Sequence, residues 1–199
     1  MKLKLSVALL IVVLTTAFAS AQFSPQLYPA GTVFKGKANF FGNVGIYDDA
    51  KTIVGAIKYG VGGYTDIDVR LGYIDVDGGG DDGMILASNF RYQLMEVRIK
   101  DPLDFSVGGY FETILGWDDS NFKLGAFAVG SRPIALNDEK DLVPFGRLIL
   151  RYDKYGDNDD VNIGLNLGSK YDLNPSTALS AEFQFDDQFG FILGVIFEM

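Results

Sequence analysis

Strict alternation of apolar and polar residues dominates this chain from residue 32 onward. The clearest case is residues 64–76, where four apolar residues share one parity: Ile67, Val69, Leu71 and Tyr73. The positions between them are polar or glycine. Successive side chains of a strand point to opposite faces, so this period predicts β-strands. No comparable helical period occurs in this part of the chain, and the pattern therefore predicts an all-β, antiparallel protein.

Clusters of Gly, Asp, Asn and Pro divide the pattern into about ten expected strands, with eight as the main rival number. Their ranges are 32–47, 51–60, 64–76, 84–95, 104–115, 121–131, 143–154, 160–171, 176–186 and 188–199. Roughly two-thirds strand is far above the 20–25% of ordinary globular domains. A closed up-and-down barrel accommodates this content, because closure leaves no unpaired sheet edge.

The expected connections between strands fall into two classes. Every second one is rich in aspartate, and these five lie at 48–49, 75–82, 116–119, 153–160 and 186–187. In an up-and-down arrangement alternate connections lie on the same rim. The sequence therefore predicts one acidic rim, with both termini of the barrel at the opposite rim.

Residues 1–21 have the pattern of a secretory signal peptide. Lys2 and Lys4 precede an apolar run at 5–14, and Ala19-Ser20-Ala21 provides a cleavage motif of the A-x-A type. The apolar run is shorter than the roughly 20 residues of a transmembrane helix. We therefore expect an exported protein with one mature domain, residues 22–199.

Alternation alone does not decide which face of the barrel meets water. Three features favour a membrane: strands near the ~9–11 residues that cross a bilayer when tilted, tyrosines near strand ends, and a polar face rich in glycine and in charges of both signs. The expected apolar face then contacts lipid. A soluble periplasmic, lipocalin-like barrel that binds an apolar ligand is the alternative.

Two segments connect the chain to a known group of proteins. Residues 90–112, FRYQLMEVRIKDPLDFSVGGYFE, and residues 169–185, SKYDLNPSTALSAEFQF, each form a strand, a turn with Asp-Pro or Asn-Pro, and a new strand. The chain resembles the small outer-membrane β-barrel proteins of Gram-negative bacteria, which include porin-like proteins of unassigned function. The resemblance implies the cell outer membrane as location, with the acidic rim outward and both termini of the mature chain in the periplasm. It also implies recognition by the barrel-assembly machinery. That family tends to end in an aromatic residue, whereas this chain ends in Met199.

Charged residues on the polar face form a candidate network in the lumen. Its members are Lys35, Lys37, Asp66, Asp68, Arg70, Arg91, Glu112, Arg147, Arg151 and Glu182. If these charges pair, the lumen is a packed polar core. If some stay hydrated and unpaired, they line a narrow, porin-like channel for small solutes. We expect a largely filled lumen, since eight strands leave almost no free interior and 16–18 are needed for a wide aqueous channel.

The composition argues against catalysis and metal binding. The chain has no histidine and no cysteine, which most hydrolytic triads and many zinc sites require. The acidic stretch 75–82 resembles half of a calcium loop, but the position that should carry a bidentate glutamate is Leu86. We expect no enzyme activity, no cofactor and no dedicated metal site. A loose role for divalent cations at the acidic rim is a separate possibility.

The charge balance constrains the partners. Without the two lysines of the signal segment, 15 basic and 26 acidic residues remain, a net charge of about −11. Such a chain lacks the basic surface that nucleic acids require. The expected partners are outer-membrane lipid, lipopolysaccharide and, during biogenesis, the assembly machinery. We expect a monomer with a structural or interaction role.

Overall fold

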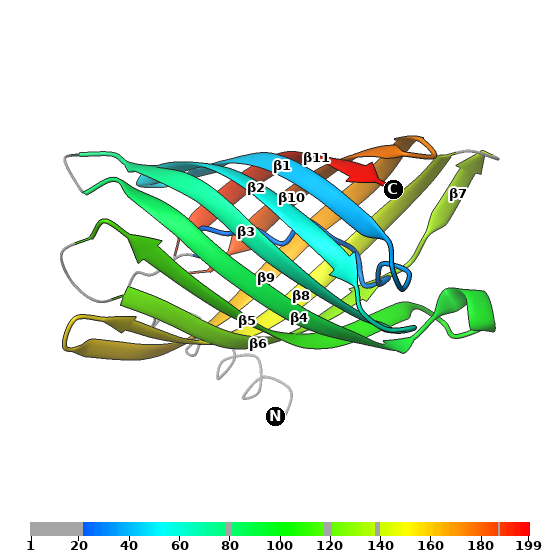
Figure 1. Cartoon of the computed structure of the whole chain (residues 1–199), viewed down its shortest axis with the longest axis horizontal. Coiled ribbons are helices and arrows are strands. Elements are labelled where there is room, and N and C mark those ends of the chain that lie inside the picture. The colour runs from blue at the N-terminus through cyan, green and yellow to red at the C-terminus, as the bar shows by residue number, and fades with distance from the viewer. Residues whose placement is uncertain (1–21, 79–80, 118–120, 138–139, 187) are drawn as a thin grey trace, which may run out of the picture.

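The computed structural model shows a closed, antiparallel barrel of ten strands (Figure 1). The structure describes residues 22–78, 81–117, 121–137, 140–186 and 188–199, so the expected signal segment lies outside the described residues. The first half of the barrel comprises β1 (Ala38–Tyr47), β2 (Ala50–Gly60), β3 (Thr65–Val76), β4 (Gly83–Met95), β5 (Asp104–Leu115) and β6 (Asn121–Ser131). The second half comprises β8 (Lys140–Tyr155), β9 (Asn158–Asn174), β10 (Thr177–Phe185) and β11 (Phe189–Glu198).

Closure of the barrel requires two pairings beyond the consecutive hairpins. The first strand, β1, pairs with the last, β11, and β6 pairs directly with β8. Between them a short strand, β7 (Ile134–Asn137), pairs with the start of β8 alone. A 3-10 turn, η1 (Val97–Ile99), lies between β4 and β5. Ten barrel strands are confirmed, and β7 is an added strand within the expected connection after residue 131.

The strand register brings opposite charges together on the inner face. Asp66 of β3 lies directly opposite Arg91 of β4, and Glu112 of β5 lies opposite Lys123 of β6. Directly opposite side chains in an antiparallel pair are close enough to interact. A slip of one residue would move each of these charges to the outer face. The alternation and the charge pairs therefore specify the same register.

The outer face of the barrel is apolar. Val69 and Leu71 are 55% and 54% exposed, while Arg70 between them is 1% exposed. The same inside-out alternation runs along β1, β2, β4 and β10. A soluble barrel would place its large apolar side chains inside, so the observed arrangement is that of a barrel in lipid.

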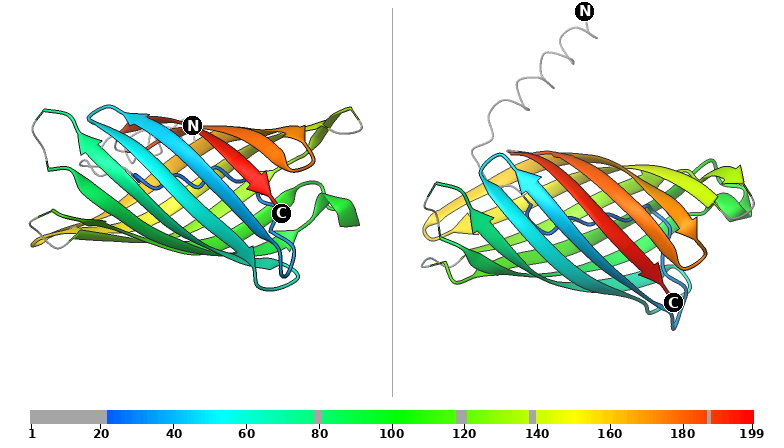
Figure 2. Two further views of the ribbon diagram at one scale, coloured as in Figure 1. Left: turned by 45° about the horizontal axis from the view of Figure 1, so that its top comes forward. Right: turned by 90° about the horizontal axis from the view of Figure 1, so that it is seen from above.

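The segment before β1 does not belong to the barrel wall. Residues 22–33 run through the interior as an irregular chain, drawn in blue inside the barrel in both views of Figure 2; the chain bends at residues 24 and 30, and Leu27 has a φ of 42°. The segment then turns at Gly36, which has a φ of 81°, before β1 begins at Ala38. The expected strand over 32–47 is therefore wrong at its start by six residues. We call residues 22–33 the lumen segment.

The direction of the lumen segment corrects the expected placement of the termini. Phe23 packs among residues near the aspartate-rich connections, including Tyr47, Ile74 and Ile114. The carboxyl end of the chain lies at the opposite rim, where the amide of Met199 donates to the carbonyl of Ala38. The first described residues therefore lie toward the acidic rim, and the two ends of the described chain do not share a side.

Candidate functional site in the barrel lumen

Six buried cationic side chains line the lumen, and each forms an ion pair with a buried carboxylate. The pairs are Lys58–Asp66, Arg70–Asp68, Arg91–Asp66, Lys123–Glu112, Arg147–Glu182, and Arg151 with both Asp153 and Asp186. Removal of charges from water is costly unless they are paired and hydrogen-bonded. Among the described residues these ion pairs contain six cations and six carboxylates, so the paired charges of the lumen cancel.

The lumen wall accepts hydrogen bonds from the main-chain amides of the lumen segment. Glu112 accepts from Ser24 at 2.9 Å and from Phe23 at 3.3 Å, and Glu182 accepts from Leu27 at 3.2 Å. Further amides donate to three wall side chains: Ala30 to Ser131, Thr32 to Gln93, and Val33 to Asp66. The carboxylates of the ion pairs therefore also bind the segment.

The wall likewise donates hydrogen bonds to the segment's carbonyl oxygens. Arg70 Nη1 donates to Ser24 at 2.6 Å, Arg147 Nη2 donates to Tyr28 at 3.0 Å, and Arg91 donates to both Pro29 and Gly31. Ser180 donates to Leu27 and Ser106 to Ala30. Buried main-chain groups must be satisfied. Here wall side chains bind six amides and six carbonyls, in place of the partners that a strand ladder would supply.

Side chains of the lumen segment enter three apolar clusters. Phe23 and Leu27 join one cluster toward the acidic rim, Ala30 joins a second with Tyr110 and Phe127, and Tyr28 joins a third. Phe23 meets Tyr47 edge to face at 5.2 Å, and Tyr28 meets Phe41 in the same way at 5.1 Å. Aromatic pairs prefer this geometry. The lumen is therefore filled by apolar packing as well as by the expected charges.

A glycine in the wall makes room for the lumen segment. A Cβ at Gly194 of β11 would lie 2.6 Å from Leu27 Cδ1 and 3.1 Å from Asn43 Cβ. Glycine permits such close approach in a strand, although it weakens the strand itself. The inward-facing glycine at this position therefore has a packing role that involves a segment remote in sequence.

Eight of the ten charged residues predicted for the lumen network lie buried in the wall: Asp66, Asp68, Arg70, Arg91, Glu112, Arg147, Arg151 and Glu182. The prediction for Lys35 and Lys37 is wrong. Both are exposed, because they lie in the turn that connects the lumen segment to β1 and not in a strand.

Sequence reasoning missed other members of the network. Lys123 and Asp153 are buried, and Asp186 pairs with Arg151. Asp153 continues the parity of Arg147 and Arg151 along β8, so the alternation contained a signal for it. Asp186 follows the last residue of β10, where the pattern ends. No alternation marks the lumen segment, and its role was not predicted.

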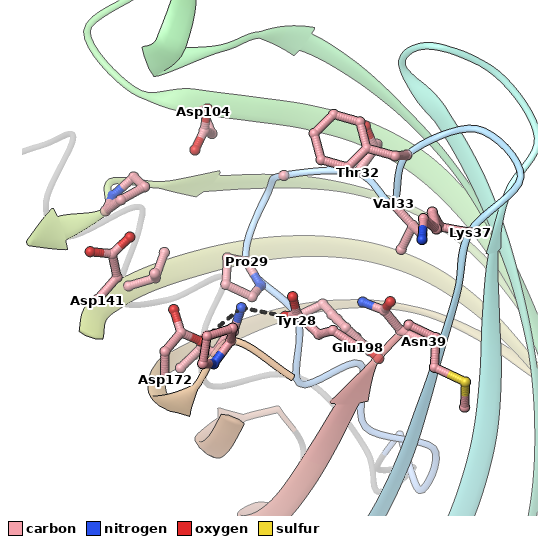
Figure 3. A pocket seen from close by; sticks show the side chains of 17 residues that line it. Tyr28, Pro29, Thr32, Val33, Lys37, Asn39, Asp104, Asp141, Asp172 and Glu198 are labelled. Atoms are coloured by element: carbon pink, nitrogen blue, oxygen red, sulfur yellow. Dashed lines mark hydrogen bonds and ion pairs between the residues drawn. The ribbon is translucent and has the colours of Figure 1, made fainter. Parts of the chain in front are cut away.

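A polar cavity opens at the rim opposite the acidic connections (Figure 3). It has a volume of about 430 Å³, and residues 28, 29 and 31–34 form part of its lining. Lys170 bridges Glu198 at 2.6 Å and Asp172 at 3.0 Å across this mouth. Residues of the lumen segment line the inner end of this cavity, so the segment separates the cavity from the rest of the lumen.

The acidic rim is held together by hydrogen bonds among its connections. Lys51 pairs with Asp77 at 2.8 Å, the Tyr73 hydroxyl donates to Asp82 at 2.7 Å, and Trp117 Nε1 donates to the carbonyl of Asp81. Within the described ranges no group of three His, Cys, Asp or Glu side chains is arranged to hold a metal ion. Asp77 and Asp82 therefore act as acceptors for side chains of β2 and β3, and the Asp81 carbonyl accepts from the connection after β5.

Comparison with known proteins identifies the fold. No family model and no curated protein matches the chain. Among solved structures, the β domain of the Bordetella autotransporter BrkA matches with a TM-score of 0.54 and 13% identity, over 82% of this chain and 98% of that one. The COG4313 outer-membrane channel of Pseudomonas putida F1 matches with a TM-score of 0.50 and 8% identity, over 89% and 100%.

The similarity to these two barrels and the apolar outer face both indicate a barrel that spans a membrane. The chain has the fold of an outer-membrane β-barrel. No helix among the described residues is long and apolar enough to span a membrane. At 8–13% identity the neighbours establish the fold alone, and the role of this barrel is argued from its lumen.

Proposed function

We propose that this protein is a closed outer-membrane barrel with a structural or interaction role, sealed by its own lumen segment. The observation that carries the proposal is the path of residues 22–33 through the interior, bonded to the wall on both its amide and carbonyl sides. A channel needs a continuous hydrated path. Here paired charges and three apolar clusters occupy that path.

The occupied lumen also argues against the alternative function, a narrow porin-like channel. An anion-selective or cation-selective pore requires charges that face water, whereas six cations and six carboxylates of the described lumen are in ion pairs. Asp104 accepts hydrogen bonds from the amide of Val97 and from Gln93 instead. The engagement of these carboxylates also disfavours a carboxylate-based catalytic site. We therefore propose no enzymatic role.

Planar-bilayer recording of the full mature chain tests the closure. We expect no discrete conductance steps at moderate voltage. A heat-dependent shift of the same sample on a gel confirms that folded barrels were present. Discrete conductance steps from folded, monomeric protein would contradict the closed barrel and support the narrow channel.

The proposed partners follow from the two surfaces. Lipid contacts the apolar outer face, and the acidic rim lies at the level of lipopolysaccharide headgroups, where divalent cations could bridge the two anionic surfaces. The assembly machinery acts on the barrel during biogenesis. We propose a monomer, and light scattering in detergent should give the mass of one chain after subtraction of the micelle.

A further inference from the structure

Side chains of the lumen wall form their hydrogen bonds mainly with the backbone of the lumen segment. Charged wall side chains bind the amides of Ser24 and Leu27 and the carbonyls of Tyr28 and Pro29. Main-chain hydrogen bonds of this kind provide affinity for any extended peptide, whereas pockets for particular side chains provide specificity. The wall provides main-chain hydrogen bonds and also side-chain pockets, because Phe23, Leu27 and Tyr28 enter apolar clusters of the wall.

The composition of the lumen segment matches the wall that surrounds it. Its sequence, QFSPQLYPAGTV, contains no charged residue, and the wall carboxylates that bind its amides, Asp66, Glu112 and Glu182, are already paired with cations of the wall. Two prolines, Pro25 and Pro29, restrict the backbone and carry no amide hydrogen that would need an acceptor. A neutral peptide without regular secondary structure is therefore the ligand class that the wall fits.

We propose that the lumen is a binding site for uncharged polypeptide without regular secondary structure, and that residues 22–33 are its ligand in cis. The site takes a peptide of about this length, with apolar anchors at the positions of Phe23, Leu27 and Tyr28. A peptide of the same sequence then binds in trans once the covalent connection to β1 is cut. This inference goes beyond the closure proposed above, because it concerns recognition of the segment and not conduction.

The turn before β1 makes the inference testable in the full chain. Phe34, Lys35 and Lys37 are exposed there and follow the last buried residue of the segment, Val33. A recognition sequence for a specific protease, inserted between Lys35 and Lys37, allows the chain to fold intact and be cut afterwards in detergent. The expected result is that the released fragment remains with the barrel during gel filtration and leaves only when the barrel unfolds.

The affinity of the cut barrel for a synthetic peptide, which replaces the released fragment, measures recognition of the segment. A synthetic peptide of residues 22–33, labelled beyond Val33 with a fluorophore, should bind the cut barrel saturably, as followed by anisotropy. N-methylation of the amides of Ser24 and Leu27 removes donors to Glu112 and Glu182. Because each hydrogen bond to a charged group contributes on the order of tenfold in affinity, the methylated peptide should bind at least tenfold more weakly. A peptide of reversed sequence is the composition control and should not compete.

Variants of the barrel provide a second, matched comparison. Arg91→Gln removes the donor to Pro29 and Gly31 and should weaken peptide binding at least tenfold, whereas Lys51→Ala at the exposed acidic rim should leave it unchanged. Loss of the fragment after cutting, with no rebinding of millimolar peptide to a barrel that still shows its heat-dependent gel shift, overturns the proposal. Equal binding of the native and reversed peptides also overturns it. Conductance of the uncut chain, which tests the closure, is measured independently of these results.

Discussion

Glu112, in the wall of β5, accepts hydrogen bonds from Ser24, 88 residues earlier in the chain, and forms an ion pair with Lys123 on β6 at 3.2 Å. One carboxylate thus connects the lumen segment to two strands of the barrel. Glu112 is fully buried, so its charge depends on these partners for stabilisation. Barrel stability and lumen closure are coupled at this residue.

Glu112→Gln should destabilise the barrel by about 3 kcal/mol, since it breaks a buried ion pair and replaces a charged acceptor with an amide. Urea unfolding in lipid vesicles, followed by the gel shift, measures the change. The double variant Glu112→Gln/Lys123→Met removes both charges and should recover part of the loss. A single variant as stable as the native chain would contradict the coupling.

Gly194→Ala should destabilise the barrel by about 1–3 kcal/mol, because the added methyl overlaps Leu27 in a packed interior. Leu27→Ala in the same chain removes the overlapping group, so the double variant should lose less than the sum of the single variants. Gly42→Ala is the matched control on the outer face, where a Cβ meets nothing within 4 Å. Strict additivity of the two inner substitutions would show that Leu27 does not occupy this space.

Leu71→Arg places a charge on the outer face of β3 and should cost about 2–4 kcal/mol if the site lies near the bilayer midplane. Leu173 lies near the end of β9, at the rim opposite the aspartate-rich connections, and the same change there should cost at most about 1 kcal/mol. Equilibrium refolding into vesicles measures both variants. Equal costs at the two positions would contradict the placement of the apolar band.

Lys51→Ala removes an exposed ion pair with Asp77 and should change stability by less than about 1 kcal/mol, since water screens such pairs. The small difference should vanish at 1 M salt, where the screening length falls to about 3 Å. The contrast with Glu112→Gln tests whether burial, and not the mere presence of an ion pair, sets the contribution. A salt-independent loss of several kcal/mol would show that this rim contact is buried in the membrane-bound protein.

The alternation in the sequence determined most of the wall. It predicted about ten antiparallel strands, which side chains share a face, and the shared rim of the aspartate-rich connections. These features are local or nearly so, because side-chain direction follows from strand period and register follows from adjacent strands. Eight of the ten predicted lumen charges were accordingly placed in the interior.

The tertiary structure alone decided what fills the lumen. Residues 22–33 have neither a strand period nor a helical one, and their partners Glu112 and Glu182 lie 88 and 155 residues away. Their main-chain groups are satisfied by side chains that only barrel closure brings together. Lys35 and Lys37 were misplaced for the same reason, since the alternation gave no sign that the chain leaves the wall before Ala38. Sequence period can specify a sheet, but the occupant of the space that the sheet encloses depends on long-range contacts.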